Sequence, residues 1–171
     1  MARNNQVLGI LFAVLFGGFL YAIHDQFEQH VVEPGERAPS FTVTTESGQR
    51  ISTTDFGGKL LVVNFWATWC PPCVEEMPSL NQFAQKMAPN GVVVLGVSID
   101  RNEKAYRAFL QQNRPSFQVA RDPKEDISSS YGSFKWPETY VINREGKVVQ
   151  KYIGPRNWND PEIVNSMRSL L

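Results

Sequence analysis

The sequence predicts an α/β fold in which helices cover both faces of a mixed central sheet. Two near-continuous apolar runs, Leu60–Trp66 and Val92–Ile99, are typical of strands that are buried on both faces. Segments with apolar residues at helical spacing alternate with these runs along the 171-residue chain. Helices on both faces of one sheet are the economical packing for such an alternation. Its 42% hydrophobic and 20% charged residues are ordinary for one globular domain.

The first half of the globular part is expected to contain a hairpin, a strand and a helix. Phe41–Thr45 and Gln49–Ser52 flank Ser47-Gly48, a pair typical of a tight turn. The first buried strand follows, and a helix is expected after Cys70. The apolar residues of this helix recur at helical spacing, and a proline inside it is expected to kink it. The apolar residues are Met77, Leu80, Ala84 and Met87, and the proline is Pro78.

The second half adds a strand, a helix, a second hairpin and a last helix. After the strand at 92–99, Asn102 is suited to cap a helix. Tyr140–Ile142 and Lys147–Ile153 flank a turn and form the hairpin. Asp160 followed by Pro161 is a helix start. The two helices have apolar faces made of Tyr106, Phe109 and Leu110, and of Ile163, Val164, Met167, Leu170 and Leu171.

An uncharged segment, VLGILFAVLFGGFLYAI, occupies residues 7–23. As a helix it would be roughly 25 Å long, within the range of membrane-spanning helices. Arg3 precedes it and Asp25 and Glu28 follow it. Because cationic residues stay on the cytoplasmic side, the remainder of the chain is expected outside the cytoplasm.

These observations divide the chain into three parts. Residues 1–23 are the expected membrane anchor, 24–36 a polar tether, and 37–171 the globular domain. The alternative for the first part is a cleaved signal peptide, although Leu20–His24 makes a poor cleavage site. Both interpretations place the domain outside the cytoplasm.

Charge and composition exclude several function classes. Seventeen Lys and Arg balance seventeen Asp and Glu, which argues against a nucleic-acid binder built on a basic surface. Both histidines, His24 and His30, precede the domain, so it has no histidine for catalysis or metal binding. No metal site and no cofactor are expected.

Both cysteines lie in the segment Trp69-Cys70-Pro71-Pro72-Cys73, at the end of a buried strand and the start of a helix. This spacing brings the two sulfurs within disulfide reach. The positive end of the helix favours the thiolate, which is the attacking species in thiol–disulfide exchange. We assign Cys70 as the nucleophile and Cys73 as the resolving thiol. An inert disulfide and half of a zinc site are the alternatives, but so short a loop adds little stability and no further ligands are close.

The two residues between the cysteines predict a reductant. Pro71 and Pro72 have no N–H groups to solvate the Cys70 thiolate, and no cationic side chain lies between the cysteines. Strong thiolate stabilisation makes a dithiol pair an oxidant. The thiolate here is only moderately stabilised, so the pair is expected to give up electrons.

Two further positions each leave two interpretations open. Glu76 is three residues after Cys73 on the same side of the helix. It either exchanges a proton with Cys73 or is simply an acidic residue in a first turn, which the helix dipole favours. Pro137, in Trp136-Pro137-Glu138-Thr139 before a strand, is either an ordinary trans proline or a cis proline in a constrained turn.

The segment FWATWCPPC, a proline five residues after it and Pro137-Glu138-Thr139 together resemble a thioredoxin fold. Over roughly residues 33–171 the chain is more narrowly similar to the membrane-anchored TlpA, ResA and DsbE group of thiol:disulfide oxidoreductases. The hairpin before the first core strand and the insertion around 101–127 contribute to this resemblance.

The resemblance implies roles for particular residues. Cys70 and Cys73 match the redox pair of the group, and Pro137 matches its cis-proline. Glu76 matches an acidic residue that the group holds near the buried cysteine, which favours the proton-carrier interpretation. Trp69, Trp136 and Pro137 then line the site for the client chain.

The resemblance also implies partners and a location. Members of the group reduce disulfides outside the cytoplasm, often those of apocytochrome c, and receive electrons from a membrane reductant of the DsbD or CcdA kind. The expected location is the bacterial inner membrane, with the catalytic domain on the periplasmic side. Lys135 replaces the second glycine of a Gly-Val-x-Gly-x-Pro pattern, and Trp136 precedes the proline. Both residues should reshape the client groove.

Two other functions remain as alternatives. A thiol peroxidase of the same fold has Thr or Ser three residues before its cysteine, where this chain has Ala67. A thioredoxin-like copper or haem-handling protein would use two cysteines with three residues between them and a distant histidine. This chain has two residues between its cysteines and no histidine after position 30.

Overall fold

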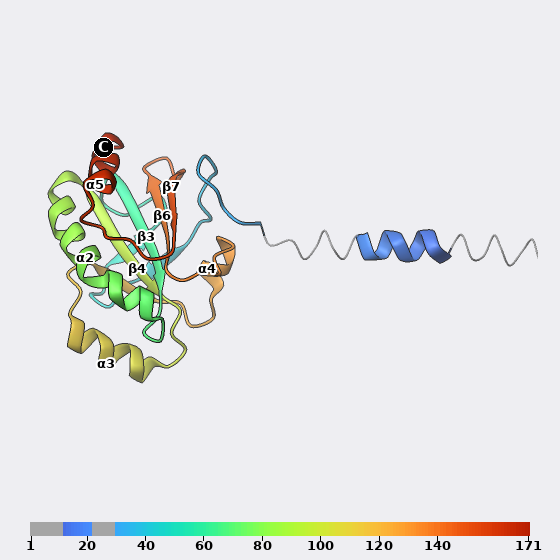
Figure 1. The fold of residues 1–171 in the computed structure, drawn as a ribbon, viewed down its shortest axis with the longest axis horizontal. Helices are drawn as coiled ribbons and strands as arrows, with labels where there is room; N and C mark the ends of the chain where they lie inside the picture. The colour runs from blue at the N-terminus through green and yellow to red at the C-terminus, as the bar shows by residue number, and fades with distance from the viewer. Residues whose placement is uncertain (1–11, 22–29) are drawn as a thin grey trace, which may run out of the picture. The chain divides into compact units, whose positions relative to one another are not determined.

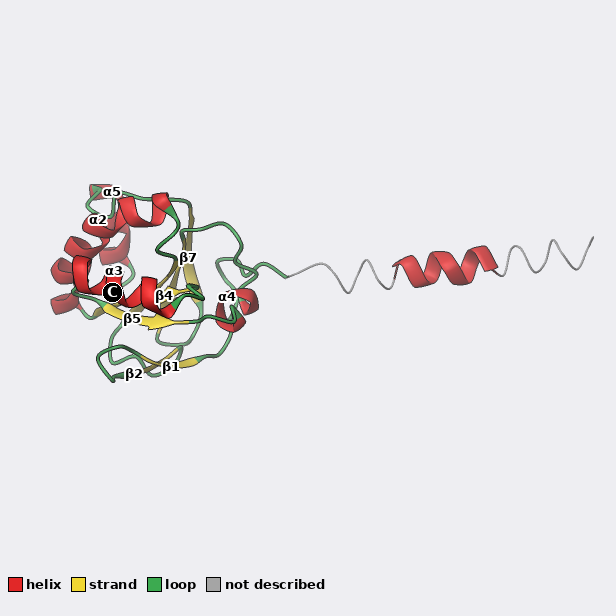
Figure 2. Ribbon diagram, turned by 90° about the horizontal axis from the view of Figure 1, so that it is seen from below, coloured by secondary structure: helices red, strands yellow, loops and turns green. Residues whose placement is uncertain are grey.

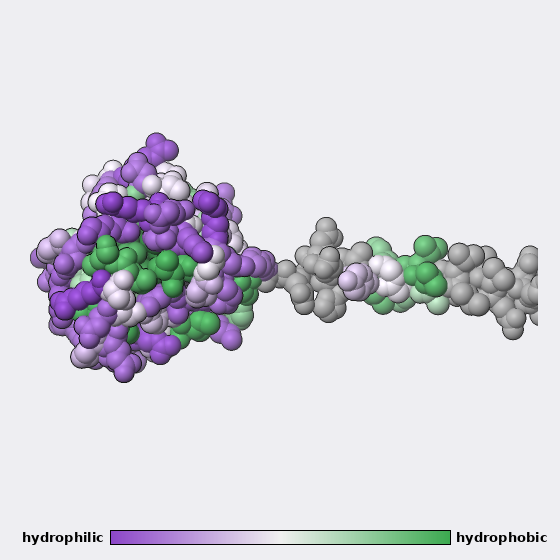
Figure 3. Space-filling view, turned by 90° about the horizontal axis from the view of Figure 1, so that it is seen from above, coloured by the Kyte–Doolittle hydropathy of each residue, from purple (hydrophilic) through white to green (hydrophobic). Residues whose placement is uncertain are grey.

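The computed structural model describes residues 12–21 and 30–171, and the chain divides into two units between His30 and Val31. In the first unit, residues 12–21 form a helix whose large apolar side chains are exposed (Figure 3). None of the helices within the described residues is both long and apolar enough to span a membrane. The remainder of the predicted anchor, and the tether up to residue 29, lie outside the described residues.

A mixed five-stranded sheet with the order β5-β4-β3-β6-β7 forms the centre of the second unit (Figure 1). The central strand β3 pairs in parallel with β4 and antiparallel with β6. At one edge β5 pairs in parallel with β4, and at the other β7 pairs antiparallel with β6. The strands are β3 Leu60–Trp66, β4 Val92–Ser98, β5 Gln118–Arg121, β6 Glu138–Asn143 and β7 Val148–Ile153.

Helices and a hairpin cover the two faces of this sheet (Figure 2). Three helices, α2, α3 and α5, pack on one face, and the hairpin β1–β2 with the short helix α4 packs on the other. A 3-10 turn, Ala88–Asn90, follows α2. The elements are β1 Thr42–Thr44, β2 Arg50–Ser52, α2 Pro71–Met87, α3 Glu103–Asn113, α4 Asp126–Ser130 and α5 Pro161–Ser169. The predicted α/β class, with a mixed sheet and helices on both faces, is confirmed.

Successive side chains of β3 point to opposite faces of the sheet, and each face has its own hydrophobic core. Val62 and Trp66 point into the core beneath α2, α3 and α5, whereas Val63 and Phe65 point into the core beneath the hairpin and α4. Every residue of β3 is buried, as its near-continuous apolar sequence predicted. This buried strand places its carboxyl end, and the cysteine segment that follows, on a rigid support.

The predicted helix starts are confirmed. The Asn102 side chain accepts a hydrogen bond from the Ala105 N–H, and the Asp160 side chain accepts one from the Glu162 N–H. The helix after Cys70 continues through Pro78, whose ring lacks the N–H for one helical hydrogen bond but does not end the helix.

The predicted element order was wrong in one region, because it omitted β5 and α4. β5 is a four-residue edge strand with two buried residues, too short for a clear period. α4 has the sequence DISSS, which is poor in strong helix formers. Its first turn is instead held by Asp122, whose carboxylate accepts hydrogen bonds from the N–H groups of residues 126–128.

Candidate active site

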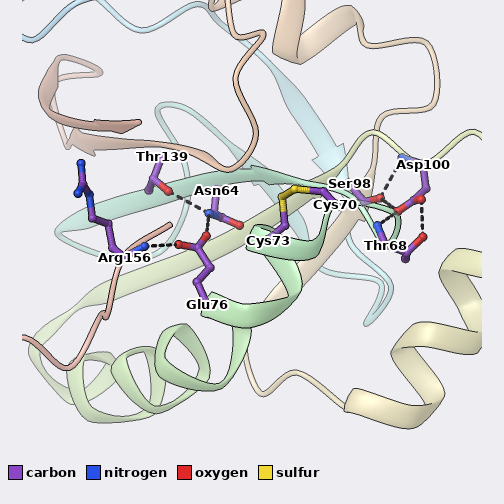
Figure 4. The surroundings of a disulfide bond; sticks show 9 residues. All are labelled: Asn64, Thr68, Cys70, Cys73, Glu76, Ser98, Asp100, Thr139 and Arg156. Carbon is purple, nitrogen blue, oxygen red and sulfur yellow. Dashed lines mark hydrogen bonds between the residues drawn. A yellow bond between two sulfur atoms is a disulfide. The ribbon is translucent and has the colours of Figure 1, made fainter. Parts of the chain in front are cut away.

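The two cysteines form a disulfide at the start of α2, just beyond the end of β3 (Figure 4). Cys70 is the residue that caps the helix, and Cys73 lies in its first turn, with Cα atoms 5.3 Å apart. Cys70 is 6% exposed and Cys73 is 0% exposed. An incoming sulfur therefore has access to Cys70 before Cys73.

The first turn of α2 offers few donors to the Cys70 sulfur. Pro71 and Pro72 occupy the first two positions of the helix and have no N–H. The Cys73 N–H is therefore the first backbone donor in the helix. The helix dipole still favours a thiolate at Cys70, but with fewer direct hydrogen bonds than an ordinary first turn supplies.

Glu76 is buried one turn after Cys73, on the side of α2 that faces the sheet. Its Oε1 accepts a hydrogen bond from Asn64 Nδ2 at 2.8 Å (Figure 4). Its Oε2 accepts from the Arg156 backbone N–H at 2.9 Å and from Trp158 Nε1 at 3.2 Å. Burial raises the pKa of Glu76 above its ordinary value, although these hydrogen bonds oppose the increase.

A surface cavity leads from solvent to Glu76. Its volume is about 450 Å³, and it lies between α2 and the loop after β7. Ser79, Arg156 and Asn157 are among the residues that line it together with Glu76. A proton on Glu76 can therefore exchange with solvent through this cavity, whose lining includes neither cysteine.

The loop before Cys70 is held by a buried aspartate. Asp100 accepts hydrogen bonds from the Thr68 N–H at 2.9 Å and the Thr68 hydroxyl at 2.7 Å (Figure 4). The Ser98 hydroxyl donates to the same carboxylate at 2.6 Å. These contacts connect the loop to the end of β4 and fix the position from which Cys70 enters α2.

The peptide bond between Trp136 and Pro137 is cis, as the resemblance implied. Phe65 pairs with Glu138 in the sheet, so Pro137 lies beside the carboxyl end of β3. Trp136 is half-buried and packs against the core that contains both cysteines. The cis-proline loop therefore lies at the same end of the sheet as the disulfide.

A buried polar network supports this loop from below. Glu138 accepts hydrogen bonds from the Ser133 hydroxyl at 2.5 Å and the Tyr140 hydroxyl at 2.9 Å. Lys151 Nζ is 3.4 Å from the same carboxylate, and both side chains are almost fully buried. Lys151 also donates to the Val32 carbonyl, which connects the network to the start of the domain.

Exposed aromatic side chains occur on both segments of the site. Trp69, directly before Cys70, is 61% exposed, and Phe134, three residues before Pro137, is 60% exposed. The Lys135 ammonium lies 5.3 Å from the centre of the Phe134 ring. Of the two predicted tryptophans, Trp69 is exposed, whereas Trp136 packs edge-on against Phe65.

Sequence reasoning singled out the cysteines, Glu76 and Pro137 but not Asn64, Asp100 or Phe134. Asn64 is a polar residue inside an otherwise apolar strand, which is a signal that could have been used. Asp100 follows a buried strand, and its role depends on contacts 32 residues away in sequence. Over the described residues, no three His, Cys, Asp or Glu side chains come together in a way that could hold a metal ion.

A redox-capable cysteine pair at the start of a helix, beside a cis-proline loop at the end of a mixed sheet, defines a thioredoxin-like dithiol protein. Comparison with known proteins makes this more specific. Residues 34–151 match the model of the AhpC/TSA family, and the chain belongs to this family.

The similar proteins include thiol-disulfide oxidoreductases. The chain is 33% identical over 156 residues to thiol-disulfide oxidoreductase ResA of Bacillus thuringiensis subsp. konkukian, covering 89% of this chain and 90% of that one. It is 33% identical over 152 residues to the thioredoxin-like protein YneN of Bacillus subtilis, covering 85% and 88%.

Solved structures agree with these relatives. A putative thiol:disulfide interchange protein DsbE from Chlorobium tepidum superposes with a TM-score of 0.70 at 30% identity, covering 81% of this chain and 95% of that one. StoA from Bacillus subtilis shares the fold, with a TM-score of 0.65, 24% identity and coverage of 80% and 98%. The chain is a thiol-disulfide oxidoreductase of the ResA and DsbE type.

Proposed function

We propose that the protein reduces disulfides of client proteins outside the cytoplasm through the dithiol form of Cys70 and Cys73. The observation that carries the proposal is the first turn of α2, in which Pro71 and Pro72 occupy the first two positions. The Cys70 thiolate receives few hydrogen bonds there, so the reduced form is not strongly stabilised. A pair of this kind gives up electrons more readily than the pair of a strong oxidant.

The reaction consists of two exchanges. The Cys70 thiolate attacks one sulfur of the client disulfide, which forms a mixed disulfide and releases the other client sulfur as a thiolate. Cys73 transfers its proton to Glu76 and attacks Cys70, so the Cys70–Cys73 disulfide forms and the second client sulfur leaves as a thiolate. The client gains two electrons and the protein loses them. Both client thiolates take up protons, one of which Glu76 can supply.

The client chain binds across the cis-proline loop. Backbone groups next to Pro137 pair with an extended client segment, and the exposed Trp69 ring contacts the residues that flank the client cysteine. Apocytochrome c, with its pair of haem-site cysteines, is the client that the resemblance to the TlpA, ResA and DsbE group implies. Lys135 and Trp136 shape this groove, so they determine which clients fit.

A membrane reductant of the DsbD or CcdA kind returns electrons to the oxidised pair. The uncharged segment at 7–23 supports a membrane anchor, which would keep the domain beside such a donor. Arg3 before this segment supports an orientation with the domain on the periplasmic side of the inner membrane. The active-site disulfide itself is the redox group, and the reaction uses no other cofactor.

Two measurements on the full chain test the proposal. The reduced protein should cleave the interchain disulfides of insulin, and a Cys70→Ser variant should not. Titration in a glutathione or dithiothreitol buffer should give a potential well below the roughly −120 mV of strong oxidants. A potential close to that value, or no cleavage of insulin, would contradict the proposal.

A further inference from the structure

Asn64 is a fully buried amide in the middle of β3, and its side chain is only partly satisfied. Its Nδ2 donates to Glu76 Oε1 at 2.8 Å and to Thr139 Oγ1 at 2.9 Å. Its Oδ1 is buried and accepts no hydrogen bond. A buried amide oxygen without a donor costs free energy, which favours a state of the protein in which a donor reaches it.

The unpaired oxygen is on the side of the resolving cysteine. Asn64 lies between Val62 and Trp66 on the face of β3 that packs in the same core as Cys73. In Figure 4 the Asn64 oxygen points toward Cys73, and its nitrogen points toward Glu76 and Thr139. The disulfide sulfur has no proton to donate, whereas the thiol of reduced Cys73 has one.

The orientation of the amide depends on the charge of Glu76. An ionised carboxylate only accepts hydrogen bonds, so it requires the Asn64 nitrogen to face it. A protonated carboxyl can donate to the Asn64 oxygen instead, and the Thr139 hydroxyl can donate or accept. Rotation of the amide by a half-turn then presents its nitrogen, a donor, to Cys73.

We propose that Asn64 is a positioning residue whose amide rotates with the proton shared by Glu76 and Cys73. When Glu76 is ionised, the Asn64 oxygen accepts the Cys73 thiol hydrogen. When the proton has moved to Glu76, the amide is reversed and its nitrogen donates to the Cys73 thiolate. Each orientation satisfies the amide at both ends, so the amide stabilises both protonation states. The inference rests on the proposed role of Glu76 and adds the group that couples it to Cys73.

The groups around the cluster agree with this assignment. α2 contributes Glu76 and Cys73, and β6 contributes Thr139. The loop after β7 contributes the Arg156 N–H and the Trp158 indole, which both donate to Glu76 Oε2 and leave Oε1 to the amide. Burial raises the pKa of Glu76, and the Arg156 guanidinium, the charged group nearby, opposes that increase. A group that stabilises the Cys73 thiolate would make proton transfer from Cys73 to Glu76 easier.

The test measures the reactivity of Cys73 as the only thiol. In a Cys70→Ser background, the rate of alkylation by iodoacetamide is followed from pH 5 to pH 10, because the thiolate is the reactive form. Four proteins are compared. They are Cys70→Ser itself and Cys70→Ser combined with Asn64→Leu, with Glu76→Gln, or with both substitutions. Ser128→Ala, which removes a buried hydroxyl from α4, is the control for general destabilisation.

We expect Asn64→Leu to slow alkylation at pH 7 by about tenfold, equivalent to one pKa unit. Adding Glu76→Gln to Asn64→Leu should change the profile much less than adding it to the background, because the coupling group is absent. Asn64→Ala also removes the amide without adding a charge, so it should slow alkylation too and serves if Asn64→Leu does not fold. Ser128→Ala should leave the profile unchanged.

Two results would separate the inference from the function on which it rests. If Glu76→Gln shifts the profile but both Asn64 variants leave it unchanged, the amide has no coupling role and the inference is wrong. The inference is also wrong if Glu76→Gln shifts the alkylation profile equally in the background and in Asn64→Leu. If Glu76→Gln alone has no effect on Cys73, the proposed proton carrier fails, and the inference fails with it.

Discussion

Two buried acids at the active-site end of the sheet are held in different ways. Glu76 accepts hydrogen bonds from Asn64, Arg156 and Trp158, none of which contributes a side-chain charge at hydrogen-bond distance. Glu138 instead has the ammonium of Lys151 at 3.4 Å. The Glu138 carboxylate therefore has a cation beside it, whereas the Glu76 carboxylate has only uncharged hydrogen-bond donors at that distance.

The Glu76→Gln variant tests the raised pKa of Glu76. Because burial raises this pKa in the folded state, the folded protein binds the proton more readily than the unfolded chain. The stabilisation of the native state by that proton is therefore complete below the ordinary value of 4.5 and is lost as pH rises through the raised pKa. As pH rises from 4.5 through the raised pKa, the free energy of unfolding of the oxidised wild-type protein should therefore fall relative to that of Glu76→Gln.

Urea unfolding of both proteins between pH 4 and pH 8 measures the difference. Comparing the two removes the contributions of the other titrating groups, which they share. A difference that stays constant with pH, or that changes in favour of the wild type as pH rises, would show that the Glu76 pKa is not raised.

The Lys151→Met variant tests the buried ion pair. It leaves the Glu138 carboxylate buried without its cation, so the free energy of unfolding should fall by about 3–5 kcal/mol. Adding Glu138→Gln removes the charge and should restore part of the loss, because the amide still accepts from Ser133 or Tyr140. Urea denaturation at pH 7 measures both. Equal stability of the single and double variants would show that the pair does not act as a unit.

At the residue scale, the sequence predicted groups with a characteristic spacing and missed those that act through distant contacts. The cysteines are three residues apart, and Glu76 is three residues further along the same helix. Asn64 is brought to Thr139 by sheet pairing across 75 residues. Such a contact has no local pattern, so it could be found only from the fold.

At the element scale, α4 depends on one carboxylate. Asp122 accepts hydrogen bonds from three successive N–H groups, whereas Asp160 accepts one at the start of α5. Asp122→Ala should therefore lower the free energy of unfolding by about 1–3 kcal/mol. This loss should be larger than that caused by Asp160→Ala, which is about 1 kcal/mol. Hydrogen exchange at residues 126–128 should accelerate in Asp122→Ala only. Unchanged exchange there would mean that packing, not the cap, holds the helix.

The elements that the sequence predicted are those whose own residues specify them. β3 and the helix starts at Asn102 and Asp160 have apolar runs or capping residues that identify them locally. β5 takes its identity from pairing with β4, and α4 from the Asp122 carboxylate. These two elements could therefore be recognised only from the assembled sheet.

At the scale of the whole molecule, the uncharged segment predicts association with a membrane. The full chain should remain with membranes after carbonate extraction, because a segment of this length and hydropathy partitions into lipid. Leu15→Asp with Phe16→Asp should release it, since each charge costs about 2.5–3.5 kcal/mol near the centre of the bilayer. Release of the unmodified chain, or its recovery with the first 20 to 30 residues removed, would contradict the retained anchor.

The most direct test of the central claim, that Cys70 attacks and Cys73 resolves, is to trap the mixed disulfide. The full chain with Cys73→Ala is incubated with a disulfide-containing client, and covalent adducts are detected by non-reducing electrophoresis and mass spectrometry. We predict that an adduct through Cys70 accumulates in Cys73→Ala. Cys70→Ala should form none, because its remaining thiol is buried beyond the reach of a protein sulfur, although a small alkylating reagent can still enter. An adduct that forms equally in both variants, or only in Cys70→Ala, would contradict the account.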